Sequence, residues 1–144
     1  MFSKACEYGI RSLIFITSKS MEGERVNLTE ISEAIDSPSA FTAKILQKLV
    51  KANIVDSVKG PHGGFIISQE SMLTVNLEKV VNVIDGDGIY SSCGLGLSRC
   101  NEKKPCPLHF QFKEVRDDLR SLLQRTSLKD LTGSLDNGLS VLKN

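Results

Sequence analysis

Residues 27–50, NLTEISEAIDSPSAFTAKILQKLV, contain two short segments with helical spacing of their apolar residues, joined by a polar turn. Asn27 and Glu30 have the spacing of a capping box, in which each side chain bonds to the backbone N–H of the other residue, and they predict a helix start. After the turn, Ser37 is expected to cap a further helix, with Pro38 in its first position. Two short helices joined by a tight turn predict a helix-turn-helix unit.

The second of these helices has the pattern of a DNA recognition helix. Its apolar stripe predicts the buried face, and the residues off that stripe are expected to be exposed to solvent. Between Pro38 and Gly60 there are four lysines and one acidic residue, a local excess of +3. This excess fits phosphate contact, although taken alone it fits a solvated helix face equally well. The residues predicted to line the major groove or its phosphates are Ser39, Ala40, Thr42, Ala43, Lys44 and Lys48.

Two β-prone runs, residues 54–58 and 65–68, flank the turn Lys59-Gly-Pro-His-Gly-Gly64. The pattern predicts a β-hairpin. Directly after a recognition helix such a hairpin is the wing of a winged helix-turn-helix, and a plain surface hairpin is the alternative. Because glycine adds no side-chain bulk, this turn can approach a phosphate backbone closely. The predicted wing contacts are Lys59, Gly60 and His62.

Helical periodicity also predicts helices over residues 3–20, 76–85 and 107–125. In the last of these the apolar residues alternate spacings of four and three, which is the heptad pattern of a seam between two chains. Packing of this helix on its own domain is the alternative. The seam residues are Leu108, Phe112, Val115, Leu119 and Leu122.

The expected fold is therefore mainly α with a small β wing: a winged helix-turn-helix plus a long C-terminal dimerisation helix, working as a homodimer. We expect a DNA-binding domain over residues 1–70. Residues 71–132 would form a connecting helix, a cysteine loop (93–109) and the dimerisation helix. Residues 133–144 would form a weakly ordered tail.

The cysteine loop holds three of the four cysteines and one of the two histidines of the chain. Thiolates suit zinc, copper(I) and iron–sulfur clusters, and imidazole can complete such a ligand shell. Structural zinc sites usually pair ligands as C-x2-C, whereas the intervals here are six and five residues. This spacing favours an iron–sulfur cluster over zinc or no physiological metal. The predicted ligands are Cys93, Cys100, Cys106 and His109, and Cys6 is expected to be a small core residue.

Composition limits the class of protein. A net charge of +1 and 40% hydrophobic residues are ordinary for a globular chain. The first residues lack the features of a signal peptide, and no apolar run approaches the ~20 residues of a membrane helix. We therefore expect a cytoplasmic protein with reduced thiols and no membrane contact. No nucleophile–base pair or phosphate loop is present, so an enzyme is not expected. The alternative to a DNA-binding regulator is an iron–sulfur or zinc protein without specific DNA binding, in electron transfer or cluster delivery.

The order of winged helix, short helix, three-cysteine loop and long helix resembles the Rrf2 family of bacterial regulators (IscR-, NsrR- and CymR-like), in its cluster-binding type. The resemblance covers residues 1–132 and is most specific at residues 7–13, 45–50 and 58–65. The three loop cysteines fall where cluster-binding members keep their thiolates, and His109 stands where IscR-like members have a histidine ligand. One departure is the first cysteine interval, where six residues replace the usual five. Another is Lys59, where an arginine is common.

The resemblance implies a transcriptional regulator, most often a repressor, whose operator affinity is controlled by an iron–sulfur cluster. A 2Fe–2S cluster is favoured over a 4Fe–4S cluster. The signal would be redox state, nitric oxide or iron–sulfur status. Some members complete the cluster with a carboxylate from the N-terminal helix of the other subunit, so Glu7 is the rival of His109 as fourth ligand. The expected DNA is a duplex with a pseudopalindromic operator.

Overall fold

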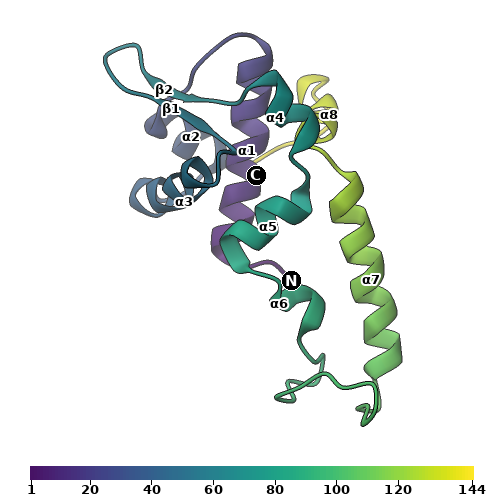
Figure 1. Ribbon diagram of the computed structural model, residues 1–144. Coiled ribbons are helices and arrows are strands. Elements are labelled where there is room, and N and C mark those ends of the chain that lie inside the picture. The colour runs from purple at the N-terminus through teal and green to yellow at the C-terminus, as the bar shows by residue number, and fades with distance from the viewer.

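The computed structural model describes residues 1–144 and is mostly helical, with one small antiparallel sheet (Figure 1). Helix α1 (Lys4–Met21) is central, and α2 (Leu28–Ile35) and α3 (Ser39–Lys51) pack against it. Strands β1 (Asp56–Val58) and β2 (Gly64–Ile66) follow as a hairpin. The predicted fold class, a winged helix-turn-helix with a long C-terminal helix, is confirmed.

The start of α2 has the predicted Asn27 cap, but the Glu30 side chain accepts from the Asn27 side-chain amide at 3.1 Å and not from its backbone N–H. The start of α3 also differs from the prediction. The Asn27 side chain accepts a hydrogen bond from the Glu30 backbone N–H at 2.9 Å. Helix α3 begins at Ser39, so Pro38 is the cap residue and not the first helical residue. The Ser37 hydroxyl does not cap α3, because it bonds to the Thr42 hydroxyl at 2.6 Å.

The hairpin is fixed to the body of the domain through Val26. Within the hairpin, Ser57 pairs with Phe65. Phe65 also bonds to Val26 in both directions, with N···O distances of 2.7 and 3.2 Å. A Cβ atom on Gly64 would lie 2.7 Å from the Val26 carbonyl oxygen, and Gly64 has φ of 140°. Only glycine therefore allows the wing to lie this close to the segment before α2.

The second half of the chain is also helical. Helix α4 (Gln69–Thr74), absent from the sequence prediction, precedes α5 (Leu77–Asp85), α6 (Gly88–Ser91) and α7 (His109–Arg125). Helix α7 packs along α5, and its far end is tied back by a hydrogen bond from Leu77 N to Thr126 O at 3.0 Å. None of the helices is both long and apolar enough to cross a membrane.

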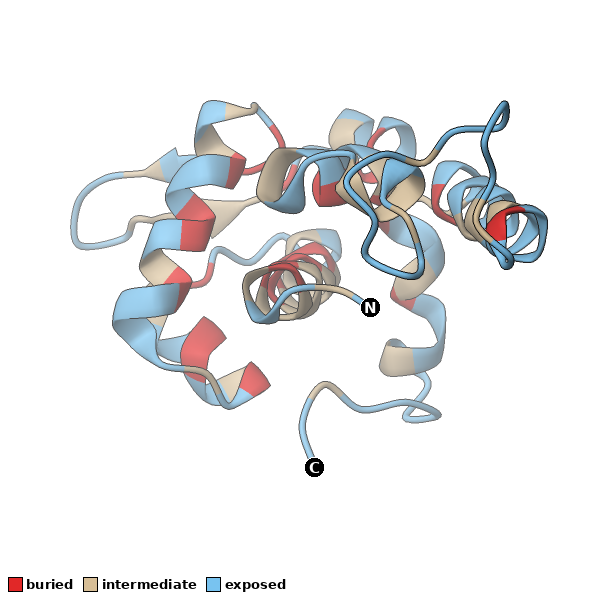
Figure 2. Cartoon of the chain, turned by 90° about the horizontal axis from the view of Figure 1, so that it is seen from below, coloured by how far each residue is buried: buried red, intermediate tan, exposed pale blue.

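Two apolar clusters hold these elements together. The larger surrounds α1, which Figure 2 shows end-on with buried positions of its neighbours turned toward it. This cluster includes Leu13 and Leu46 but also Val80 and Leu128, so one core joins residues on both sides of position 70. The smaller cluster joins α1, α5 and α7 and contains Cys6, Leu77, Val81 and Leu123. The division into domains at residues 70 and 132 stays a prediction.

The last residues fold back onto the helix-turn-helix through two hydrogen bonds. The weak order expected for residues 133–144 stays a prediction. After a 3-10 turn (Lys129–Leu131), α8 covers Gly133–Asp136. The Arg11 guanidinium donates to the Leu142 carbonyl at 3.0 Å, and Lys143 donates to the carbonyl of Glu33 at 2.9 Å. These bonds use backbone acceptors that a sequence pattern does not reveal.

Candidate metal and nucleic-acid sites

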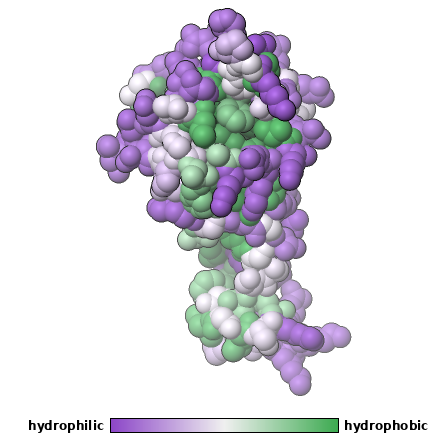
Figure 3. All heavy atoms as spheres, turned by 90° about the vertical axis from the view of Figure 1, so that its left-hand side faces the viewer, coloured by the Kyte–Doolittle hydropathy of each residue, from purple (hydrophilic) through white to green (hydrophobic).

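The cysteine loop connects α6 to α7 at the end of the molecule away from the hairpin (Figure 1). Figure 3 shows this end as a small lobe with a hydrophobic patch. Leu95 and Leu97 in the loop are about half exposed, at 50% and 56%. The candidate metal ligands lie in this lobe, while the recognition helix α3 lies in the other half of the molecule (Figure 1).

The four predicted ligands form two pairs. The sulfur atoms of Cys93 and Cys106 lie 3.8 Å apart, and the Cys100 sulfur lies 3.2 Å from Nδ1 of His109. All the cysteines are free thiols. No three of the chain's acidic, cysteine or histidine side chains converge where one metal ion could bind. The pairs are neighbours because His109 follows Cys106 within one turn, with a hydrogen bond from His109 N to Cys106 O at 3.0 Å.

The spacing within the first pair suits two ligands of one metal. Metal–thiolate bonds of ~2.3 Å at tetrahedral angles put two sulfur atoms ~3.8 Å apart. The backbone N–H groups of Leu95 and Leu97, followed by a hydrogen bond with Cys106, lower the pKa of Cys93. Backbone donors aimed at the sulfur stabilise the thiolate, which is the form that binds metal.

His109 is buried at the first position of α7, with 4% of its surface exposed. Its Nδ1 faces the Cys100 thiol, while its Nε2 is buried without a hydrogen-bond partner. A ligating nitrogen must be free of its proton, so ligation through Nδ1 would leave the proton on Nε2. The donor set of three thiols and one oriented imidazole fits an iron–sulfur cluster.

Two further residues of α7 contact the loop, and neither contact could be predicted from the sequence pattern. A Cβ atom on Gly94 would lie 2.7 Å from the Phe112 ring, so the loop backbone passes directly over that ring. The Arg116 guanidinium donates to the Ser92 carbonyl at 2.7 Å and to the Cys100 sulfur at 3.3 Å. The loop is thus held on the same helix that carries the predicted seam.

The residues named from α1 lie apart from this donor set. Cys6 is fully buried, and burial, with the Asp85 carboxylate second, raises its thiol pKa to about 12. The expectation of a core cysteine is confirmed. Glu7 forms an exposed ion pair with Lys4 at 2.9 Å, and the hydrogen bond from Lys4 lowers its carboxyl pKa. Its role as a ligand supplied to another subunit stays a prediction.

Most of the predicted recognition surface on α3 is exposed. Ser39, Ala40, Lys44 and Lys48 are exposed, and Ala43 is half-buried. The prediction for Thr42 is wrong, because its side chain is fully buried and its hydroxyl donates to the Pro38 carbonyl at 2.9 Å. Helical spacing adds two exposed residues that sequence reasoning missed, Gln47 and Lys51.

The tip of the hairpin is open to solvent. Lys59, Gly60 and His62 are exposed, as predicted, and Gly60 has φ of 106°, which favours glycine. Arg25, which sequence reasoning missed, donates to the His62 carbonyl at 3.5 Å and adds a cation beside the wing. Contact of these residues with DNA stays a prediction.

The predicted seam on α7 is largely without a partner in the single chain. Val115 is 62% exposed and Leu122 is 44% exposed, and Leu108 and Phe112 are also exposed. Leu119 differs, since it is half-buried against the cluster that contains Cys6 and Leu123. An exposed apolar stripe along a helix is typical of a surface that packs against another chain.

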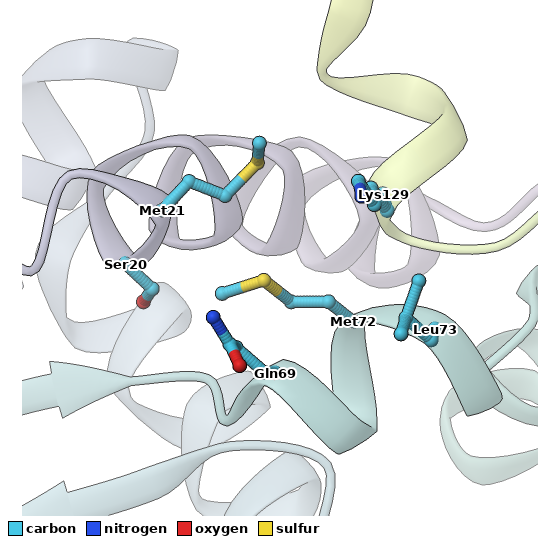
Figure 4. A pocket seen from close by; sticks show the side chains of 6 residues that line it. All are labelled: Ser20, Met21, Gln69, Met72, Leu73 and Lys129. Atoms are coloured by element: carbon cyan, nitrogen blue, oxygen red, sulfur yellow. The ribbon is translucent and has the colours of Figure 1, made fainter.

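One cavity lies away from all of these residues. It has a volume of about 310 Å³ and lies between the end of α1, α4 and the 3-10 turn (Figure 4). Two methionines, a leucine and three polar side chains line it, so it offers no group of metal-binding or catalytic residues. Its lining residues are Ser20, Met21, Gln69, Met72, Leu73 and Lys129.

A winged helix-turn-helix with a basic, exposed recognition helix defines a DNA-binding transcriptional regulator. The chain belongs to the Rrf2 family, whose model, described as an iron-dependent transcriptional regulator, matches residues 2–134. This membership excludes an enzyme and a cluster carrier without a regulatory role.

Individual relatives agree with this assignment. The chain is 25% identical to the HTH-type transcriptional regulator IscR of Photorhabdus laumondii over 127 residues, 88% of this chain and 76% of the relative. Its fold is similar to that of CymR, the global cysteine regulator of B. subtilis, with a TM-score of 0.76 and 20% identity over 92% of this chain and 95% of the other. The IscR structure of T. potens gives a TM-score of 0.73 and 17% identity, over 98% and 92% of the two chains.

Proposed function

We propose that this regulator binds an iron–sulfur cluster in its cysteine loop and that the cluster controls its affinity for a pseudopalindromic operator. The observation that carries the proposal is the pairing of Cys93 with Cys106 and of Cys100 with His109. It gains weight from membership in a family described as iron-dependent.

The two pairs favour a 2Fe–2S cluster over a 4Fe–4S cluster. Each iron of a 2Fe–2S cluster takes two protein ligands, whereas a 4Fe–4S cluster takes one ligand at each of four corners. Cys93 and Cys106 would hold one iron, and Cys100 and His109 the other. When bound, such a cluster supplies a centre that oxidants and nitric oxide attack.

The protein would act as a homodimer through α7. Its exposed stripe, including Val115 and Leu122, would pack against the same stripe of a second copy. Two-fold symmetry would set two copies of α3 into successive major grooves, ~34 Å apart. Lys44 and Lys48 would contact phosphates, with Lys59 and His62 at the wing, and binding would repress transcription.

Ordering of the cysteine loop on cluster binding would couple the cluster to the dimer interface. Ligation of all four residues fixes a glycine-containing loop that also rests on Phe112, and Phe112 is part of the exposed stripe. A ligand shifts an equilibrium only through different affinity for its two states. Loss of the cluster would free the loop, change the support of Phe112 and so change the placement of the two recognition helices.

Anaerobic purification with iron and sulfide analysis tests the cluster. The wild type is expected to be coloured with two irons and two sulfides per chain, and Cys100→Ala to be colourless. Operator affinity, measured by fluorescence anisotropy, is expected to differ between loaded wild type and Cys100→Ala by ~5–150-fold, the usual range of allosteric coupling. Cys6→Ala is the matched control and should keep the colour. A wild type with zinc in place of iron and sulfide, or equal operator affinities, would refute the sensor.

A further inference from the structure

Arg116 lies where α7 meets the cysteine loop and has no carboxylate partner. Its guanidinium donates to the Ser92 carbonyl at 2.7 Å and to the Cys100 sulfur at 3.3 Å. Its Nε is buried without a partner, and none of the ion pairs of the chain includes it. A half-buried cation without a counter-charge is costly, so its surroundings should supply one.

The next arginine on the helix shows that this arrangement is specific. Arg120, one turn further along α7, forms an ion pair with Glu78 at 2.7 Å and lies over the Tyr90 ring. It contacts no sulfur atom. Of the two arginines, one is neutralised by a carboxylate and the other is aimed at a thiol.

We propose that Arg116 is a positioning residue of the metal site: it holds the cysteine loop on α7 through Ser92 and Cys100, and it would face the negative charge of a bound cluster. Nη1 of the guanidinium bonds to the carbonyl of Ser92, directly before Cys93. Nη2 bonds to the sulfur of Cys100, which belongs to the second ligand pair. The planar guanidinium directs a separate nitrogen at each of these two points, whereas a lysine would have one nitrogen for both.

This placement has two consequences. In the chain without a cluster, Arg116 keeps residues 92–100 on α7, so that the ligand pairs are arranged before metal arrives. In the loaded protein, a hydrogen bond to a ligand sulfur stabilises added negative charge, so it raises the reduction potential of the cluster. Arg116 also stands one turn after Phe112 and directly after Val115, so it connects the ligands to the exposed stripe. The inference rests on the proposed cluster site only for its second consequence.

Hydrogen exchange of the apoprotein tests the first consequence without any cluster. The reporters are the amides of Leu95, Gly96 and Leu97, which bond to Cys93. We expect Arg116→Ala to speed their exchange about tenfold, the effect of losing hydrogen bonds to a charged group. Arg120→Ala, the matched control, should leave the exchange rates of these amides unchanged. Arg116→Lys should give rates between those of the wild type and Arg116→Ala. Equal exchange in wild type and Arg116→Ala would overturn the anchoring role.

The reduction potential of the loaded protein tests the contact with Cys100. Titration with dithionite, which supplies one electron per cluster, should give a more negative midpoint for Arg116→Ala and Arg116→Lys than for wild type and Arg120→Ala. Equal midpoints in all four proteins would overturn the thiolate contact. A wild type that takes up no iron and sulfide would refute the proposed function, while amide exchange would still decide the anchoring role of Arg116. If Arg116→Ala does not fold, Arg116→Lys alone decides, because it keeps the charge and the methylene stem.

Discussion

A single charge on the exposed stripe of α7 should separate dimer formation from folding. Val115 is the best position because it is 62% exposed in the single chain and contributes to neither apolar cluster. Replacement by Asp at such a position changes the stability of one chain by no more than ~0.5 kcal/mol. Leu119→Asp is a poorer probe, because Leu119 packs on the cluster around Leu123 and its loss would also destabilise the monomer.

The expected effect on the dimer follows from burial. Full burial of a valine side chain contributes ~2 kcal/mol, so covering the 62% that is exposed contributes ~1.2 kcal/mol per chain. Because both chains of a two-fold dimer carry the substitution, the lost burial energy is doubled to ~2.5 kcal/mol. Desolvation of two unpaired carboxylates adds at least a further ~2.5 kcal/mol. The total of ~5 kcal/mol weakens the dimer by more than ~1,000-fold.

Sedimentation velocity over a range of protein concentrations measures this change. Val115→Asp should sediment as a monomer where the wild type is a dimer, and its operator affinity should fall because one half-site contact is lost. Ser121→Asp is the matched control, since it adds the same charge to an exposed position on another face of α7. A Val115→Asp protein that remains dimeric at wild-type concentrations would show that the stripe is not the interface.

Four further outcomes follow from local contacts. Lys48→Ala should weaken binding to all DNA sequences and reduce the salt slope by ~1, measured by anisotropy. Asn27→Ala removes the cap of α2 and should cost ~1 kcal/mol in denaturant unfolding. Gly94→Ala would place its Cβ 2.7 Å from the Phe112 ring, so iron and sulfide uptake should fall. Cys6, with its thiol pKa raised to about 12, should resist iodoacetamide at pH 8 while the loop cysteines of the apoprotein react, as mass spectrometry can show.

The helix-turn-helix could be predicted from the sequence because its signals are local. The Asn27–Glu30 cap, the apolar stripes and the glycine-rich turn each act over a few residues, and the structure contains all three. The apolar stripe of α7 could also be predicted, because its residues repeat at a fixed spacing in the sequence and this spacing does not depend on the packing partner. The three cysteines and His109 stood out by residue type alone.

The features that escaped prediction depend on contacts between distant segments. Thr42 has the spacing of an exposed residue but is buried, because the Pro38 carbonyl and the Ser37 hydroxyl bond to its hydroxyl. The contact of Arg116 could not be read from the sequence, because only the path of the loop brings the thiol of Cys100, 16 residues earlier, within hydrogen-bond distance. The path of the tail could not be read from its own residues, because the Arg11 side chain that bonds to the Leu142 carbonyl lies at the other end of the chain.

The distance between the cysteine loop and the DNA-binding face limits how a cluster could control this protein. The loop lies at the end of the molecule opposite the hairpin, so the candidate ligands lie far from the proposed wing of the same chain (Figure 1). The loop contacts α7 at His109, Phe112 and Arg116. The same two turns of α7 carry Val115 of the exposed stripe. Under the proposed function, changes in the loop would therefore reach the operator by altering how two chains meet, and the dimer would be the element with two states.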